Sequence, residues 1–513
     1  MIAALRYEFN SINKYRRVLN PMKILSIKLL ATGLITILLS ISSQSHADDA
    51  QKRNIIFILV DDQRWDAIGK LNPYFTTPHL DALIENGVYF PNAFVTTSLC
   101  SPSRASFLSG QWAHKHGVLD NSTVLPRSTP TFPVELHNAG YETAFLGKWH
   151  MGGSTDEKQP GFDHWVSFRG QGLYFNQTFN VNGERVKTEG HNTDRVTDYA
   201  IEFIKRKHDK PFMAYVSHKA VHAEFKPAER HLDSYKGRTY PYPDSMADTE
   251  ENYAGKPNWV RRQRDTWHGV DGLYNRTMTM DQFTLRYAET MRAVDDSVGR
   301  IIATLKEEGL YESTVLVFTS DNGFQFGEHG LIDKRTMYEA SIRIPLIVHC
   351  PELFKGGQIR KQMVLSVDLF PTLMDAAGIP TPDSVQGQSY YPILQDEHAP
   401  GRDAFVYNYF WESFFPQTPT VIGVRTDRYK LMRYHGIFDR DEMYDIQNDP
   451  DEMNNLIGEF YTRAGAGNVD FNMRSKSALP EDLYDAYWDL RKKLDRETQR
   501  IELVGNPDWL EVQ

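Results

Sequence analysis

Short, nearly continuous apolar runs constrain the fold more than any other feature of this chain. Four of them span residues 54–60, 212–217, 314–319 and 346–349. Runs of this length suit strands that are buried on both faces of a sheet. The chain is therefore expected to build its core around a covered sheet.

Helical patterns lie between and after these runs. They cover residues 78–86, 284–309 and 366–377, and Gly309 and Gly378 are candidate helix C-caps. Alternation of strands and helices predicts an α/β fold with a large mixed, mostly parallel sheet sandwiched by helices. This main domain is expected over residues 48–400.

The tail of the chain has a different pattern. Residues 405–409, 421–425 and 429–434 are rich in β-formers and separated by turn residues, and residues 481–500 have helical periodicity. We expect a smaller C-terminal subdomain over residues 401–513, with an antiparallel sheet and a helix. By contrast, residues 226–282 are weakly periodic, and loops of that length in compact domains are usually functional or disordered.

The amino-terminal segment has the pattern of a signal peptide. Charges end at Lys28, an apolar run of about thirteen residues follows, and Ser45-His46-Ala47 resembles a cleavage site. The run is shorter than the roughly 20 residues that a membrane-spanning helix needs. We therefore expect residues 1–47 to direct export to the periplasm or the medium, with no stable membrane insertion and with Met22 as an alternative start. An uncleaved membrane anchor is the competing interpretation.

The charge balance makes nucleic acid an unexpected partner. The chain has 57 basic and 67 acidic residues, a formal net charge of −10, and loss of residues 1–47 would leave −15. An acidic protein binds nucleic acid and anionic membranes poorly in general. An anionic substrate would have to be bound by a local cluster of basic residues.

Polar residues follow three of the apolar runs. Asp61 and Asp62 follow the first, His218 follows the second, and Asp321 and Asn322 follow the third. Ligands of α/β sheets bind at the carboxyl ends of the strands. Carboxylate and amide oxygens at two strand ends suit Ca²⁺ or Mg²⁺, although helix N-caps or solvated turns explain them equally well.

Only two cysteines occur, so no disulfide framework organises the fold. Cys350 stands in an apolar run and is expected to be a core residue. Cys100 stands just before Pro102, a favoured residue in the first helical turn, so it is expected at a helix N-terminus where an anion is stabilised. Arg104 follows one turn later.

The segment around Cys100 resembles a known signature. Residues 100–110 read CSPSRASFLSG, which is similar to C-x-P-S-R-x(4)-[TS]-G of the type I sulfatases of the alkaline phosphatase superfamily. In that family a maturation enzyme of the export pathway oxidises the cysteine to formylglycine. Further motifs occur in family order: LVDDQR at 59–64, GYETAFLGKWHMG at 140–152, SHKAVH at 217–222, TSDNG at 319–323 and DKRTMYEASIRIP at 333–345.

The resemblance implies a role for each matching residue. Asp61, Asp62, Asp321 and Asn322 match metal ligands, usually of Ca²⁺ with Mg²⁺ as the alternative, and the modified Cys100 would be a further ligand. Arg104 would hold the hydrated nucleophile, Lys148 would bind sulfate, and His150 would contact the second hydroxyl of the nucleophile. His218 and Lys334 match the pair at the bridging oxygen, either of which could protonate the leaving alcohol.

The substrate is expected to be a sulfated carbohydrate. Aromatic and arginine residues cluster in three expected loops, at 168–179, 259–267 and 407–415. Aromatic faces suit sugar rings, and arginines suit sulfate or carboxylate groups. The pattern resembles bacterial polysaccharide sulfatases, so an algal galactan or a glycosaminoglycan is plausible. The candidate substrate-binding residues are His222, His329, Arg262 and Trp267.

Three alternatives remain open on the sequence. The first is hydrolysis of phosphate or phosphonate esters by the same superfamily fold, although a phosphatase proper would have serine or threonine in place of Cys100. The second is a non-catalytic sulfoglycan-binding protein in which Cys100 stays a thiol. The third is a scavenger of small aryl sulfates, which would need fewer aromatic loops. The oligomeric state is not indicated.

Overall fold

The computed structural model describes residues 52–437, 439–458 and 480–503. The described residues from Arg53 onward belong to one compact unit. The predicted signal peptide, residues 1–47, lies outside the described residues. In the part of the chain that is described, no helix is long and apolar enough to cross a membrane.

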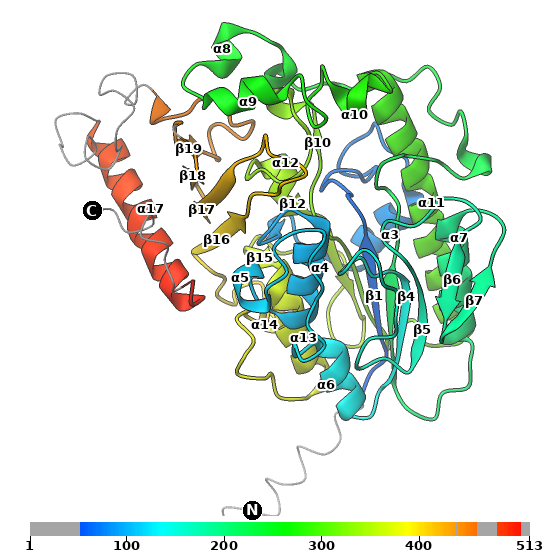
Figure 1. Cartoon of the computed structure of the whole chain (residues 1–513). Coiled ribbons are helices and arrows are strands. Elements are labelled where there is room, and N and C mark those ends of the chain that lie inside the picture. Colours follow the sequence, from blue (N-terminus) through cyan, green and yellow to red (C-terminus); the bar gives the residue numbers. More distant parts are fainter. Residues whose placement is uncertain (1–51, 438, 459–479, 504–513) are drawn as a thin grey trace, which may run out of the picture. The chain divides into compact units, whose positions relative to one another are not determined.

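A ten-stranded sheet forms the centre of the fold (Figure 1). Five neighbouring central strands run parallel, while β13, β6 and β7 are antiparallel to their partners. The predicted mixed, mostly parallel sheet is confirmed. In spatial order the strands are β14 (Gln358–Ile359), β2 (Val88–Tyr89), β13 (Leu346–His349), β9 (Val315–Ser320), β1 (Ile55–Val60), β8 (Phe212–Ser217), β4 (Glu142–Lys148), β5 (His164–Phe168), β6 (Thr178–Val181) and β7 (Glu184–Lys187).

Helices cover both faces of this sheet because its central strands are apolar on both sides. Along β1, Ile56 and Ile58 face one core and Phe57 and Leu59 face the other, as alternation of side chains requires. The first core is closed by α3 (Pro78–Asn86), α7 (Asn192–Ile204) and α11 (Met280–Glu307). The second is closed by α4 (Cys100–Ser109), α6 (Phe132–Asn138), α13 (Leu369–Ala377) and α14 (Tyr391–Gln395).

The tail forms the predicted antiparallel sheet and helix. Its four strands are β16 (Ala404–Tyr409), β17 (Thr420–Thr426), β18 (Tyr429–His435) and β19 (Glu442–Asp445). The helix α17 (Glu481–Arg500) buries Tyr487, Leu490 and Leu494 in the same core as this sheet. The division expected between residues 400 and 401 therefore falls between two sheets of one compact unit.

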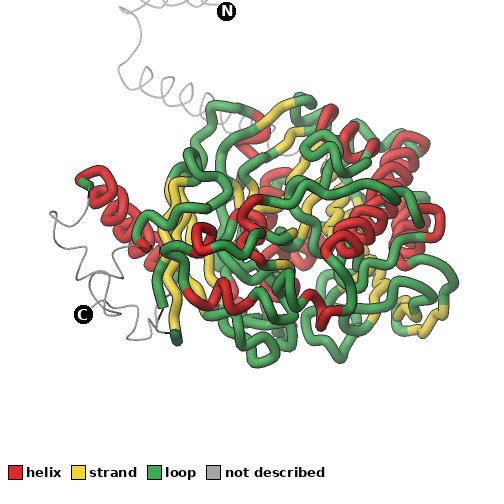
Figure 2. The backbone as a smooth tube through the Cα atoms, turned by 90° about the horizontal axis from the view of Figure 1, so that it is seen from above, coloured by secondary structure: helices red, strands yellow, loops and turns green. Residues whose placement is uncertain are grey.

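Two small sheets and several short helices complete the description. The strands are β10 (Gln325–Phe326) with β11 (Ile332–Asp333), and β12 (Arg343–Ile344) with β3 (Ala93–Phe94) and β15 (Val364–Leu365). The helices are α5 (Ala113–His116), α8 (Glu250–Tyr253), α9 (Asn258–Gln263), α10 (Leu273–Arg276) and α12 (Glu339–Ile342). The weakly periodic segment 226–282 thus contains α8, α9 and α10. Figure 2 looks down on the top of the molecule as drawn in Figure 1 and shows loops and short helices on the side that faces the viewer.

Candidate active site

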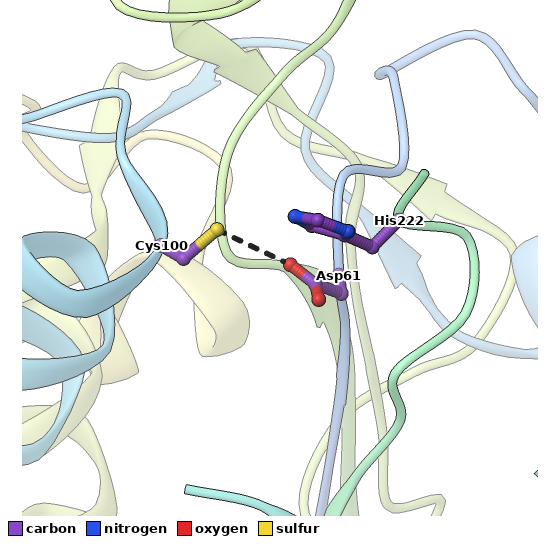
Figure 3. A group of neighbouring side chains, drawn as sticks. All are labelled: Asp61, Cys100 and His222. Atoms are coloured by element: carbon purple, nitrogen blue, oxygen red, sulfur yellow. Dashed lines mark hydrogen bonds between the residues drawn. The ribbon is translucent and has the colours of Figure 1, made fainter. Parts of the chain in front are cut away.

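Cys100 is the first residue of α4 and is completely buried. Its Sγ lies 3.5 Å from Oδ1 of Asp61 (Figure 3). Burial raises the pKa of the Cys100 thiol well above its ordinary value. Because the thiolate is the nucleophilic form, an unmodified Cys100 is a weak nucleophile in this position.

Two acidic strand ends lie side by side next to Cys100. Asp61 and Asp62 follow β1, and Asp321 follows β9, its parallel neighbour, in which Ser320 pairs with Val60. One carboxylate oxygen from each aspartate lies within 4.8 Å of the others. The backbone N–H of Asp62 also donates to Oδ1 of Asp321 over 3.0 Å. Register between two parallel strands therefore creates the cluster.

Burial and crowding perturb these carboxyl groups in opposite directions. Burial, reinforced by the charge of Asp61, raises the pKa of Asp321 to about 7. Burial also raises the pKa of Asp62, against the effect of Lys334. For Asp61 burial acts in the same direction, but Lys148, His222 and Arg104 hold its pKa well below the usual range. Ionisation of all three carboxyl groups is therefore unfavourable unless positive charge lies close to them.

The oxygen donors fit a hard divalent cation. Asn322 donates from Nδ2 to Oδ1 of Asp62 over 2.7 Å, which leaves its own Oδ1 for another partner. That Oδ1 is buried and accepts no hydrogen bond from the described residues. Three carboxylates and one unpartnered amide oxygen form the kind of donor set that Ca²⁺ or Mg²⁺ takes. All four predicted oxygen ligands therefore lie together.

Arg104 joins the nucleophile helix to this cluster. Its Nε donates to Oδ2 of Asp321 over 2.9 Å, and its Nη1 donates to the Lys148 carbonyl and to Oγ of Ser217. Its Nη2 lies 3.7 Å from Oδ1 of Asp61 and is buried without a hydrogen-bond partner in the described residues. The guanidinium is thus fixed in place, and its Nη2 can still donate hydrogen bonds to a bound ligand.

Two buried lysines bring further positive charge to the cluster. Lys148 ends β4 and pairs with Asp61, and Lys334 follows β11 and pairs with Asp62. Burial would lower the pKa of Lys334, but Asp62 and Cys100 hold it well above the usual range. With Arg104, these lysines place three cations around the Cys100 side chain.

The side chains of two histidines complete the centre, by which we mean Cys100 together with the acidic cluster and the three cations around it. Nδ1 of His150 lies 3.4 Å from Oγ of Ser101, next to Cys100. Figure 3 shows His222 pointing toward Cys100 and Asp61, and one atom of each of these three residues lies within 4.8 Å of the others. Nδ1 of His222 lies 2.7 Å from the Ala223 carbonyl oxygen, so Nδ1 carries the hydrogen, and Nε2 lies 3.9 Å from Oδ2 of Asp62. Burial, with the charge of Lys148, holds the pKa of both imidazoles well below the usual range.

His218, the predicted partner of Lys334 at the bridging oxygen, lies apart from these residues. It follows β8, and its Nε2 lies 3.0 Å from Oγ of Ser297 on α11. Its neighbour Ser217 faces Arg104, and successive side chains of a strand point to opposite faces. Of the two histidines in SHKAVH, the structure therefore places His222 at the centre and His218 behind the sheet.

The other candidate substrate residues lie away from the cluster. The ring of His329 packs 4.1 Å from that of Tyr338, and the charges acting on it are Lys256 and Lys430. Arg262 lies on α9 and makes no side-chain contact with the cluster within the described ranges. Trp267 is 40% exposed and packs against Tyr274.

Sequence reasoning missed several residues of the site. The Lys219 ammonium lies 4.6 Å from the ring centre of Tyr174, and burial lowers its pKa to about 8. Gln171 accepts a hydrogen bond from Lys148. Next to Lys334, Asp333 contacts His268 over 3.3 Å and Arg335 donates to Glu412 over 2.8 Å. Lys219, Asp333 and Arg335 stand inside the quoted motifs. Gln171 and Glu412 stand in the aromatic loops 168–179 and 407–415, and His268 directly follows the third such loop, 259–267.

Known proteins share both the sequence and this fold. Residues 53–379 match the family described as Sulfatase, and residues 327–475 match N-sulphoglucosamine sulphohydrolase, C-terminal. N-acetylglucosamine-6-O-sulfatase of Bacteroides thetaiotaomicron is 32% identical over 477 residues, covering 80% of this chain and 84% of that protein. The ulvan-active sulfatase of Formosa agariphila is 27% identical over 485 residues, covering 90% and 89%.

Solved structures agree with these matches. A protein in complex with its substrate D-glucosamine-2-N,6-O-disulfate superposes with a TM-score of 0.79 at 28% identity, covering 90% of this chain and all of that one. The phosphonate monoester hydrolase of Agrobacterium radiobacter, at 18% identity, shares the fold with a TM-score of 0.69 over 86% and 96% of the two chains. The chain belongs to the sulfatase family and is a sulfuric ester hydrolase.

Proposed function

We propose that this protein hydrolyses sulfate esters of a sulfated carbohydrate, using a formylglycine made from Cys100 and a divalent cation, Ca²⁺, held by the acidic cluster. One observation carries the proposal: the buried Cys100 side chain lies 3.5 Å from a carboxylate that is itself surrounded by cations. The high pKa of the thiol argues against direct attack by cysteine. The modification therefore gives this position a reactivity that the thiol lacks.

The charges around Cys100 suit a sulfate ester. Arg104, Lys148 and Lys334 are all buried there, so their fields are weakly screened. A sulfate ester carries negative charge spread over its oxygens, and fixed cations stabilise that charge as the reaction proceeds. When bound, the cation would hold a sulfate oxygen and polarise the hydrated aldehyde.

Two histidines would transfer protons during release of the alcohol and of sulfate. The hydrated aldehyde would supply one hydroxyl to attack sulfur, its proton passing to Asp61, whose Oδ1 lies 3.5 Å from the Cys100 Sγ, and a second hydroxyl whose deprotonation expels sulfate and re-forms the aldehyde. His150 is neutral in this environment and would accept that second proton. His222 would donate to the leaving alcohol from Nε2, because an anionic sulfate bound beside it raises its pKa and brings in a proton. Lys334 would bind the sulfate and the bridging oxygen.

Maturation would require a separate enzyme acting early. Cys100 is completely buried in the folded chain, so a modifying enzyme must reach it before folding is complete. Such timing suits export, which the signal peptide predicted at residues 1–47 supports. We therefore propose a formylglycine-generating partner and a periplasmic or secreted location.

The names of the similar proteins support the substrate class. One relative is an N-acetylglucosamine-6-O-sulfatase, another is an ulvan-active sulfatase, and one structural neighbour binds a sulfated glucosamine. Amino sugars of the glycosaminoglycan type are therefore the first substrates to test, and sulfated algal polysaccharides are the second.

Two measurements test the proposal. The intact mass of the Cys100 peptide should fall by about 18 Da relative to the thiol after expression with a maturation enzyme. The matured protein should then release sulfate from 6-O-sulfated N-acetylglucosamine. Finding only unmodified cysteine in active protein from the native host would contradict the mechanism.

Phosphonate hydrolysis is the second candidate function. It is favoured by the fold shared with a phosphonate monoester hydrolase. Comparing an aryl sulfate with an aryl phosphonate and an aryl phosphate separates the two candidates. Faster turnover of either phosphorus ester would overturn the sulfatase proposal.

A further inference from the structure

A cavity of about 810 Å³ lies beside the centre and has no role in the chemistry described so far. Ala223, which directly follows His222, is part of its wall. Its volume falls in the range of roughly 300–1,000 Å³ that is usual for small-molecule sites. Its wall also includes the aromatic and apolar residues Phe175, Leu232, Trp267 and Tyr274 and four charged residues.

Tyr274 connects this cavity to the catalytic cluster. Its side chain lines the cavity and is buried, and its hydroxyl has no hydrogen-bond partner among the described residues. The charged groups that act on this hydroxyl include Asp333, Asp62 and Lys334. A buried hydroxyl without a partner is unusual in a folded protein, and a ligand in the cavity can bind it once the Tyr274 ring turns toward that ligand.

Trp267 provides an open aromatic wall in the same cavity. It is 40% exposed, and its ring stands edge-on to Tyr274 with 5.6 Å between the ring centres. The next residue, His268, contacts Asp333 over 3.3 Å. The two adjacent side chains therefore lie in different places: His268 contacts a neighbour of Lys334, and Trp267 lines the cavity.

The charge of the cavity suits an uncharged sugar face better than a second anion. Two acidic side chains, Glu224 and Glu229, and two basic ones, Lys226 and Arg286, line the cavity, so its wall has no net charge, and Glu224 pairs with Lys226. Leu232, 57% exposed, and the ring of Phe175 add apolar surface. Aromatic and apolar walls with a few polar groups suit the face of a pyranose ring.

We propose that this cavity is a subsite for the sugar residue next to the sulfated one. That residue would stack on Trp267 and accept or donate a hydrogen bond at the Tyr274 hydroxyl. The inference rests on the proposed function, because it requires a sulfated carbohydrate at Cys100. It adds that the protein recognises a chain of at least two sugars.

The test compares two substrates that carry the same sulfate. One is 6-O-sulfated N-acetylglucosamine, and the other is an oligosaccharide with that residue at its end. For Trp267→Ala, the loss of kcat/KM on the oligosaccharide should exceed the loss on the monosaccharide by about tenfold, mainly through KM. Trp267→Phe keeps an aromatic face and should recover most of this difference.

Two further variants complete the design. Trp411→Ala removes another exposed tryptophan, on the loop after β16, and should lose no more on the oligosaccharide than on the monosaccharide. Tyr274→Phe keeps the buried ring and removes only the hydroxyl, so it tests the subsite even where Trp267→Ala folds poorly. It should also lose several-fold more on the oligosaccharide.

The outcomes separate this inference from the proposed function. Equal losses on both substrates for Trp267→Ala and Tyr274→Phe, or no loss on either, would overturn the subsite. Failure of the matured wild-type protein to release sulfate from any sulfated sugar would instead overturn the proposed function.

Discussion

The Sγ of Cys100 lies 3.5 Å from Oδ1 of Asp61, so the candidate nucleophile position and the candidate metal site form one buried unit. Asp61 directly follows β1, and Cys100 is the first residue of α4, which packs on one face of the sheet. A substitution at either residue therefore alters the surroundings of both the nucleophile and the metal ligands. The predictions for this unit have to separate chemistry from stability.

Cys100→Ala should abolish sulfate release and leave substrate binding intact. The substitution removes the nucleophile but none of the three cations that surround the sulfate. Sulfate release and the binding of a sulfated sugar by calorimetry check the two halves. Cys350→Ala is the matched control, since Cys350 is equally buried but packs in the core beneath α13 and α14. It should retain turnover; measurable turnover by Cys100→Ala, expressed with the same maturation enzyme, would rule out the assigned nucleophile.

Asn322→Ala should weaken Ca²⁺ binding by tenfold or more, because it removes the one amide oxygen of the donor set, a loss of about 1.4 kcal/mol. Ligand binding to the native state raises the melting temperature. In wild-type protein a chelator should lower Tm and Ca²⁺ should restore it, whereas Asn322→Ala should show little response.

The control for the metal prediction is a second buried asparagine. Asn180 donates from Nδ2 to the Asp156 carbonyl over 2.8 Å, far from the acidic cluster in sequence. Asn180→Ala should lower Tm with and without Ca²⁺ but keep the full Ca²⁺ response. An unchanged Ca²⁺ response in Asn322→Ala would show that the cation binds elsewhere.

The acidic cluster could be predicted from the sequence because strand register determines it. Asp61 and Asp321 each follow a continuous apolar run, and parallel neighbours bring such residues to one edge. The choice between His218 and His222 could not be made in this way. It depends on which face of β8 the chain presents at its end and on the path of the following loop. The contact of Arg335 with Glu412 joins residues 77 positions apart through a loop, and no local pattern encodes it.

His222→Ala should slow sugar sulfates far more than activated aryl sulfates. A sugar alkoxide leaves poorly without a proton, and general acid catalysis contributes about 10²- to 10⁴-fold. An aryl sulfate with a nitrophenol leaving group needs little help. Rates for a series of leaving groups, plotted against their pKa, should therefore become steeper in the variant.

His218→Ala is the comparison for this experiment. It removes the contact with Ser297 and should lower Tm, but the slope against leaving-group pKa should match that of the wild type. A steeper slope in His218→Ala, with none in His222→Ala, would reverse the assignment of the two histidines.

Lys219 should set the alkaline limb of the pH profile. Burial lowers its pKa to about 8, so the ammonium loses its proton as pH rises through that value. Its charge interacts with those of Lys148 and Asp61, so its loss lowers the positive potential that attracts a sulfate ester, and kcat/KM should fall above pH 8. Bound substrate, being anionic, raises the lysine pKa, so the limb in kcat should lie at higher pH than the limb in kcat/KM. Lys219→Arg keeps its charge throughout this range and should move the kcat/KM limb upward; a limb that stays near pH 8 in this variant would assign the titration to another group.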